Sequence, residues 1–487
     1  MEPEHSRALL LASGVTSTPA SRLEQRLNDS VVAVSVDPGM PGAELTARVL
    51  VTTLRRGPGH LVLLDDRLTH HMVADLVAAA TAIDPTRPLR ITRTVPDSVT
   101  TRVHVGASVP GQVIRVVPDG HGAHLASTRT AVIRPARPGT PLGAVYAAAL
   151  AAGEVFKHTA RVLTRRRVIH RHLRFCPVTC TTDLAACPIP TGPLRMDLAL
   201  LGVGAIGTGI VLLLRELDAE GTLLAADRQR YAPENKGTYS LGGVAEVETA
   251  PWKVDLARQN LPRFDVTPFH DPVESLIKAV DDGKAPWPRL VLTAFDSADA
   301  RRDAQRLWPD RLIDAATGDT MLGLHDHQYG NDPCMWCVFP VRRNQPSGAE
   351  RIAEQLGLPV ELLAEADTIL TDEHLAGLTD EQRRRLVPHL GTPMCGLARA
   401  TGLTSLDANG YMPSIPFVSL QAACLSVGRL LATHLGVDTP SNFIQYDSLI
   451  GPQAASIDAM RIRLDCICRT RAHTIDKVRA ARARARL

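Results

Sequence analysis

The stretch LALLGVGAIGTGIVLLLRELDAEGTLLAAD, residues 198–227, decides the fold that we expect. An apolar run enters a glycine turn, an apolar helix follows, and a second apolar run ends at Asp227, 20 residues after Gly207. Gly202, Gly204 and Gly207 let the backbone turn tightly and approach a phosphate at the helix N-terminus. An acid at the end of the second strand is placed to accept hydrogen bonds from ribose hydroxyls. The stretch therefore predicts a βαβ unit that binds an adenosine nucleotide.

The bulk composition predicts a cytoplasmic protein of two or three domains. The chain has 487 residues, 45% hydrophobic and 22% charged, with a formal net charge of +3. This small charge argues against a nucleic-acid or membrane-surface partner. The N-terminal stretch has no basic region of the kind that precedes a signal sequence, and no run approaches the ~18 apolar residues of a spanning helix. Nine cysteines are an odd number, which favours reduced, metal-bound or catalytic thiols over a disulfide framework.

Alternating strand-like and helix-like segments predict a doubly wound α/β sheet, preceded by a separate α/β domain. No internal repeat is evident. The expected regions are an N-terminal α/β domain (1–190), the doubly wound domain (195–345), a polar helical insertion with a crossover loop (346–410) and a C-terminal part that completes the domain and ends in a basic, solvated helix (411–487). Two roles stay open for residues 1–190: a degenerate adenylation half, or a domain that recruits the substrate peptide.

Within the first region we expect no catalytic motif. Its His70, His71 and Asp65–Asp66 are typical of solvated loops. The segment CPVTCTTDLAACPIPTGP, 176–193, is rich in Pro and Thr and predicts a linker. Its CxxxC spacing is a weak zinc signal.

The residues after Asp227 carry a resemblance to a known family. Asn235 and Lys253 follow it, and Asp296 then ends a strand-like segment shortly before Arg301. This order resembles the ubiquitin-activating and ThiF/MoeB/HesA adenylyltransferase superfamily, which has a glycine turn, a ribose Asp, Asn-x-x-Arg, a Lys, and an Asp followed by a helix with Arg. The resemblance implies a ThiF-type Rossmann-like domain, ATP with Mg²⁺, and a homodimer.

The residue types suit adenylation. Attack of a carboxylate on the α-phosphate of ATP builds charge on phosphate oxygens, which Lys253 and Asn235 would hold. Mg²⁺ prefers hard oxygen ligands, and Asp296 supplies one. Asp227 would hold the ribose. The resemblance implies that the substrate is the C-terminus of a ubiquitin-like or sulfur-carrier protein, or a ribosomal peptide, with later transfer to a thiol, sulfide or amine.

One departure from the family pattern is Thr238, which stands where the family has Arg. A threonine cannot supply a cationic fork to phosphate. A non-catalytic scaffold that presents a peptide therefore stays open as an alternative. An NAD-dependent oxidoreductase also stays open, because Asp227 would suit NAD. The candidate substitutes for the missing cation are Lys236, Arg228 and Arg230, or, in the place of a partner subunit's arginine, Arg171 and Arg174.

The remaining cysteines predict a zinc site and a candidate nucleophile. Two short-spaced thiol pairs can close a tetrahedral Zn²⁺ site, as the resemblance also implies. The expected ligands are Cys334, Cys337, Cys466 and Cys468, with His473 as a possible replacement for Cys468. Cys395 lies in GTPMCGLARATG, the expected crossover loop, where the resemblance implies an acyl or sulfur acceptor; an ordinary loop or core thiol is the alternative.

Overall fold

A computed structural model of the chain describes residues 20–127, 132–161, 169–190, 192–318, 320–340, 348–364, 368–391, 394, 397, 415–439 and 441–484. Internal contacts divide the chain into two compact units. Unit one comprises Met1–Phe295, Asp299–Val338 and Ser414–Leu487, and unit two comprises Asp296–Ala298 and Phe339–Pro413. Cys395 lies outside the described residues.

The first half of unit one, up to residue 190, is built on a mixed seven-stranded sheet in the order β3-β2-β1-β4-β5-β6-β7. Its strands are β1 Val31–Val36, β2 His60–Leu64, β3 Arg90–Thr92, β4 Thr101–Val105, β5 Ile114–Asp119, β6 Gly122–Ala126 and β7 His172–Phe175. Its helices are α2 Ala20–Asn28, α3 Ala43–Arg55, α4 His70–Ile83 and α5 Pro141–Ala160. The first five strands in this order are parallel, and β6 and β7 are antiparallel additions.

The second half, from residue 195 onward in unit one, is built on a mixed eight-stranded sheet in the order β10-β9-β8-β11-β12-β13-β14-β15. Its strands are β8 Arg195–Leu201, β9 Glu220–Ala226, β10 Phe264–Phe269, β11 Leu290–Thr293, β12 Arg311–Gly318, β13 Met321–Gln328, β14 Phe443–Asp447 and β15 Ser456–Asp458. Its helices are α6 Ala205–Glu216, η2 Pro233–Asn235, α7 Val244–Thr249, α8 Lys253–Asn260, α9 Val273–Asp281, α10 Ala298–Gln305, α11 Met335–Val338, α17 Pro416–His434, η5 Pro452–Ala454, α18 Ile467–Thr470 and α19 Ala472–Arg484.

The two halves repeat one topology. In both sheets the third, second, first, fourth and fifth strands lie side by side and parallel, the order of a doubly wound, Rossmann-like sheet. The likeness extends to single hydrogen bonds. The amide of Asp65, after the second strand, donates to Thr92 O at 3.1 Å, and the amide of Asp227 donates to Phe269 O at the same distance. The first half is therefore an α/β domain of the same plan as the second.

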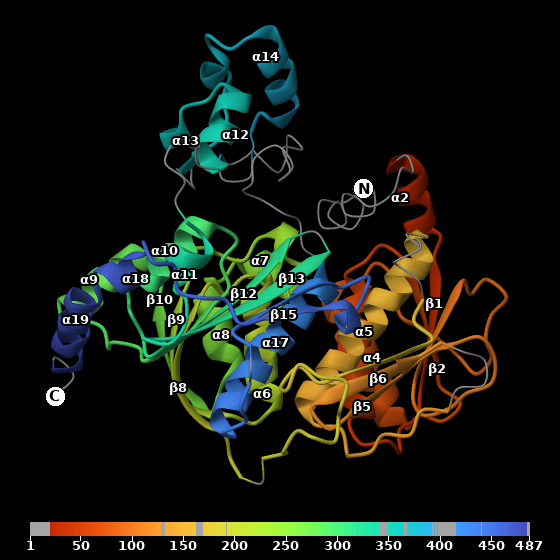
Figure 1. Cartoon of the computed structure of the whole chain (residues 1–487). Coiled ribbons are helices and arrows are strands. Elements are labelled where there is room, and N and C mark those ends of the chain that lie inside the picture. The colour runs from red at the N-terminus through yellow and green to blue at the C-terminus, as the bar shows by residue number, and fades with distance from the viewer. Residues whose placement is uncertain are drawn as a thin grey trace. The chain divides into compact units, whose positions relative to one another are not determined.

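Two long helices, α5 and α17, pack against each other between the sheets (Figure 1). Helix α5 covers β5 and β6, and α17 covers β12 and β13. Both begin with Pro at the first turn, where its missing N–H costs nothing. Both also carry Gly at the same later position, Gly153 and Gly428. At Gly428 the backbone of residues 177–178 approaches closely, and a methyl group there would lie 2.4 Å from Pro177 O. The helices thus join the two halves through one continuous core.

Helix α17 is long and apolar enough to cross a membrane by length and composition. It is packed inside the protein over 89% of its most apolar window. Its hydrophobicity is accounted for by the core between the two sheets.

The predicted linker connects β7 to β8, and part of it packs into the core. Cys176, Cys180 and Cys187 are buried, and Val178 is fully covered. The amide of Cys176 donates to Thr181 O, and Gly428 of α17 packs on Pro177. Interaction with the Cys187 thiol lowers the pKa of Cys176 to about 6, against the opposing effect of burial. The proline-rich composition correctly indicated an irregular segment. It did not indicate that this segment packs against α17.

Unit two is a small helical body with its own core. Its elements are α12 Gly348–Leu356, α13 Val360–Ala364, η3 Asp372–Leu375, α14 Asp380–Leu386 and η4 Val387–His389. Thr379 caps α14, its hydroxyl accepting from Gln382 N while the Gln382 side chain returns to Thr379 N. Leu356, Leu375 and Leu386 lie at the centre of its apolar cluster.

Candidate functional site

The glycine turn lies where the sequence predicts, between β8 and α6. Gly202 has φ +90°, a conformation that side chains rarely adopt, and a methyl group there would lie 2.9 Å from Ala294 O. Gly204 is the N-cap of α6, so that the first amides of this helix point out of the turn. A methyl group on Gly207 would lie 2.2 Å from Gly202 O. The glycines therefore hold helix and strand close together at the N-terminus of α6, where Gly204 and Ala205 are half-buried.

Asp227 is half-buried and lies directly beside this turn. One carboxylate oxygen accepts from Val203 N at 2.8 Å and the other from Gln229 N at 2.9 Å. A carboxylate offers about four lone-pair sites. Acceptor capacity therefore remains for ribose hydroxyls, while Asp227 also fixes the shape of the turn.

The segment 232–243 packs against the same turn; it is called here the phosphate loop after the predicted role of its Asn235. Its Asn235 is buried and its side-chain oxygen accepts from Ala232 N at 2.9 Å, which closes the short helix η2. The amide of Ser240 donates to Thr208 Oγ1 on α6 at 3.1 Å. The hydroxyl of Tyr239 faces Gly204, where a methyl group would lie 3.8 Å from it. The loop thus closes one side of the glycine turn.

Lys253 is the buried cation of this region. It is 3% exposed, its ammonium donates to Gln229 Oε1 at 2.6 Å, and it lies 5.2 Å from the Tyr239 ring centre. Burial disfavours its charged form, but Tyr239 and the Asp227 carboxylate outweigh burial and raise the pKa of Lys253. The side chain is therefore charged at neutral pH, and an ammonium can serve up to three acceptors.

Thr238 is fully buried, and its hydroxyl lies 3.5 Å from Asn235 O. It does not replace the family's arginine. Of its candidate substitutes, Arg230 is engaged elsewhere, since it donates to Ala250 O at 3.0 Å and stacks 4.2 Å from the Trp252 ring centre. Arg171 and Arg174 are exposed on the edge of the first sheet, at β7.

Asp296 follows Ala294 and Phe295 after β11, is exposed, and is assigned to unit two. Its predicted role as a Mg²⁺ ligand stays a prediction. Arg301, by contrast, is a buried structural residue. It donates to Phe295 O, and its Nε lies 3.5 Å from Asp314, which also accepts from Thr293 Oγ1 at 2.6 Å. Arg301 therefore holds the segment that leads to Asp296.

The four predicted zinc ligands come together. The ligand atoms of Cys334, Cys337, Cys466 and Cys468 all lie within 4.8 Å of one another. Sulfur–sulfur distances are 3.5 Å from Cys334 to Cys466 and 3.6 Å from Cys337 to Cys468. A tetrahedron with Zn–S bonds near 2.3 Å has edges of about 3.8 Å. The set therefore fits a structural metal ion in size and chemistry, and the CxC spacing is no obstacle.

His473 does not belong to this cluster; it is exposed on α19. Among the described residues, the four cysteines are the only group of three or more potential ligands close enough for a metal ion. Cys176, Cys180 and Cys187 therefore form no such site.

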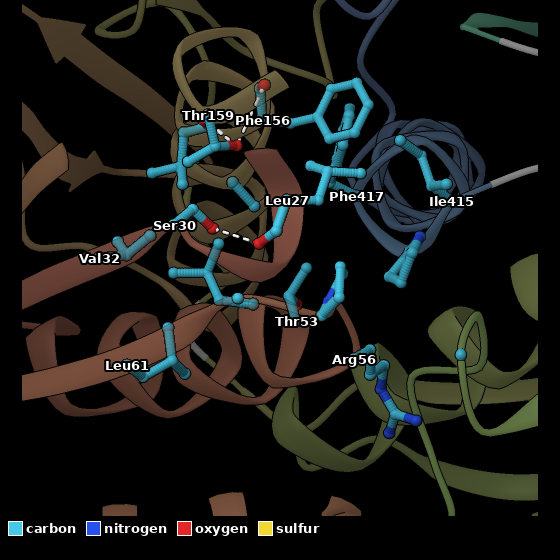
Figure 2. Close-up of a pocket in the computed structure, with 18 residues that line it drawn as sticks. Leu27, Ser30, Val32, Thr53, Arg56, Leu61, Phe156, Thr159, Ile415 and Phe417 are labelled. Atoms are coloured by element: carbon cyan, nitrogen blue, oxygen red, sulfur yellow. Dashed lines mark hydrogen bonds between the residues drawn. The ribbon is translucent and has the colours of Figure 1, made fainter. Parts of the chain in front are cut away.

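A second feature, which sequence reasoning missed, is an apolar pocket between the halves (Figure 2). It encloses about 680 Å³, part of it open to solvent. Leu27 and Val32 line it from the first half, Phe156 from α5, and Ile415 and Phe417 from the start of α17. Arg56 and Gly237 complete the wall nearest the phosphate loop. The lining residues are distant in sequence, which explains why no motif marks them.

No protein-family model matches the chain, and no curated protein matches it significantly in sequence. The fold and the local geometry therefore carry the functional argument.

Proposed function

We propose that this protein catalyses ATP-dependent adenylation of a carboxylate. The substrate we infer is the C-terminus of a ubiquitin-like or sulfur-carrier protein or of a ribosomal peptide. The carboxylate oxygen forms a bond to the α-phosphorus of ATP, the bond between the α- and β-phosphates breaks, and pyrophosphate leaves. A thiol, sulfide or amine would then take the acyl group and release AMP.

The observation that carries this proposal is Lys253, a buried ammonium kept charged beside the glycine turn and the ribose acid. A dinucleotide's pyrophosphate is held by a helix N-terminus alone in many Rossmann sites. A fixed cation adds most where negative charge develops during the reaction, as in attack on the α-phosphate. Lys253 and the free amides of α6 would share that charge. Asp296 would hold Mg²⁺, which neutralises the phosphates when bound.

One alternative has an observation in its favour. Thr238 is buried in the phosphate loop, so the family's second cation is missing at that position. A chain that binds a nucleotide or peptide without turnover, as a scaffold, would fit this change. An NAD-dependent oxidoreductase is the remaining alternative, because Asp227 also suits the ribose of NAD.

The test is calorimetric titration of Mg·ATP and, separately, of NADH into the wild type and Asp296→Ala. We expect ATP to bind with a dependence on Mg²⁺ that the variant loses. Asp299→Ala is the matched control, because Asp299 is another exposed acid close by, engaged with Arg302. Binding of NADH with no binding of ATP would refute the proposal. ATP binding without pyrophosphate release from any peptide substrate would favour the scaffold.

A further inference from the structure

The phosphate loop is shaped by the first half of the protein. Gly243, at the end of this loop, packs so closely on the last turn of α4 that a methyl group there would lie 2.0 Å from Ala82 O. Gly242 has φ +81° and lies against the Tyr231 ring. The loop therefore has no room to move toward the first half.

Arg56, the residue after α3, holds the same loop by hydrogen bonds. It is 5% exposed and donates to Lys236 O at 2.5 Å and to Gly242 O at 2.9 Å. These two carbonyls flank the segment that contains Thr238 and Tyr239. A guanidinium carries its donors in a rigid fork and can bind two carbonyls at once. Figure 2 shows Arg56 at the edge of the pocket, between the first-half ribbon and the second-half loop.

Because Arg56 and Gly243 fix the position of the phosphate loop, they also fix the loop residues that face the candidate nucleotide site. Beyond Lys236, the loop places Tyr239 against Gly204 and beside the Lys253 ammonium, and it anchors Ser240 on α6. Arg56 itself donates to main-chain carbonyls on the other side of the loop. Arg56 therefore contacts the loop and not the phosphate position itself, which other groups of the loop are expected to face.

We propose that Arg56 is a positioning residue: the first half sets the phosphate loop in its binding-competent shape through this side chain, and Arg56 does not touch the nucleotide. This inference rests on the proposed nucleotide site. It gives residues 1–190 a role, which is to act as a built-in brace for the nucleotide half.

The test compares Arg56→Met, Arg56→Lys and Arg48→Ala in the full-length chain. Methionine keeps the apolar stem against the pocket but removes both hydrogen bonds, and lysine retains one donor group. Arg48 is the matched control: it also joins the two halves, by an ion pair to Glu216 at 2.9 Å, but it lies away from the loop. The measurements are Mg·ATP affinity by calorimetry, hydrogen exchange of peptides within 232–243, and the unfolding midpoint.

We expect Arg56→Met to weaken ATP binding by at least about tenfold, since two hydrogen bonds from a charged donor are lost. The rate of hydrogen exchange in peptides of the phosphate loop should rise, with little change in peptides of β8 or α19. Arg56→Lys should fall between this variant and the wild type, and Arg48→Ala should bind ATP normally. Unchanged loop exchange in Arg56→Met would overturn the inference, as would unchanged affinity. An equal loss in Arg48→Ala would also overturn it, by showing a general effect of joining the halves.

The same measurements distinguish failure of the positioning role from failure of the proposed function. If the wild type binds no ATP, the proposed function fails, and exchange of the loop still decides whether Arg56 braces it. If the wild type binds ATP and the Arg56 variants do so equally well, only the positioning role fails.

Discussion

At the scale of single residues, Gly204 and Gly207 of the turn have different structural roles. Gly207 faces backbone, because a methyl group there would lie 2.2 Å from Gly202 O. Gly204 faces the candidate site, and a methyl group there would meet only Tyr239 Oη, at 3.8 Å. The sequence motif marks both alike; the structure separates a packing glycine from one that leaves room for a ligand.

This difference predicts opposite outcomes for two matched substitutions. Gly207→Ala should destabilise the protein by about 1–3 kcal/mol, the usual range for overpacking. Gly204→Ala should unfold at the wild-type temperature but bind Mg·ATP less tightly, because its methyl group occupies the approach of the phosphates. Thermal unfolding and calorimetric titration of both variants provide the check. Wild-type ATP affinity in Gly204→Ala would show that the nucleotide does not approach this turn.

At the scale of elements, packing decides roles that composition leaves open. The basic C-terminal helix α19, which we expected to be solvated, is fastened to the second half. Arg482 is 6% exposed and donates to Asp281 and to Leu307 O. The Arg479 guanidinium stacks 3.8 Å from the Tyr329 ring centre and pairs with Asp310. Most of the helix is exposed, as expected, but these two arginines attach it to the second half, which sequence spacing alone does not reveal.

The cysteine cluster joins α11 to α18 and predicts one zinc ion per chain. Cys468→Ser should lose the metal. A contribution of about 2 kcal/mol from zinc would lower the unfolding midpoint by roughly 2 °C, because the unfolding entropy of a chain this long is about 1 kcal/mol/K. His473→Ala should keep one zinc ion and the wild-type midpoint, because His473 lies outside the cluster. Metal content by mass spectrometry and thermal unfolding test both variants; full zinc occupancy in Cys468→Ser would contradict the assignment.

At the scale of the whole molecule, unit one is two domains of one topology joined by α5 and α17. Much of α17 is covered by α5 and by its own sheet. The homodimer that the resemblance implies stays a prediction, and it would need a surface other than this helix face. Polar groups are enclosed at the junction as well, including the Tyr146 and Tyr446 hydroxyls, 3.2 Å apart.

Buried histidines make the stability of the molecule sensitive to acid. Burial lowers the pKa of His104, His121, His170 and His327 to about 4. The unfolded chain takes up protons near pH 6.5, whereas the folded chain does so only near pH 4. Stability is therefore intact above about pH 6.5 and declines as the pH falls toward 4. For His327 alone the loss is on the order of 3 kcal/mol at the acidic end.

We therefore expect the unfolding midpoint to fall steadily between pH 7 and pH 4.5, by several degrees per pH unit. Thermal unfolding in buffers of constant ionic strength measures this. His327→Gln should flatten part of the decline. A midpoint that does not change between pH 7 and pH 5 would show that the folded chain takes up protons on these histidines over the same pH range as the unfolded chain.

The sequence by itself determined the local features. The glycine turn with its spaced acid predicted the β8–α6–β9 unit, because these features depend on neighbours along the chain. The cysteine pairs were likewise visible as pairs. Only the tertiary structure decided that these pairs meet, that the first half repeats the topology of the second, and that Arg56 reaches the phosphate loop. These facts depend on contacts between residues more than a hundred positions apart, and hydrophobic packing of that range leaves no periodic trace in the sequence.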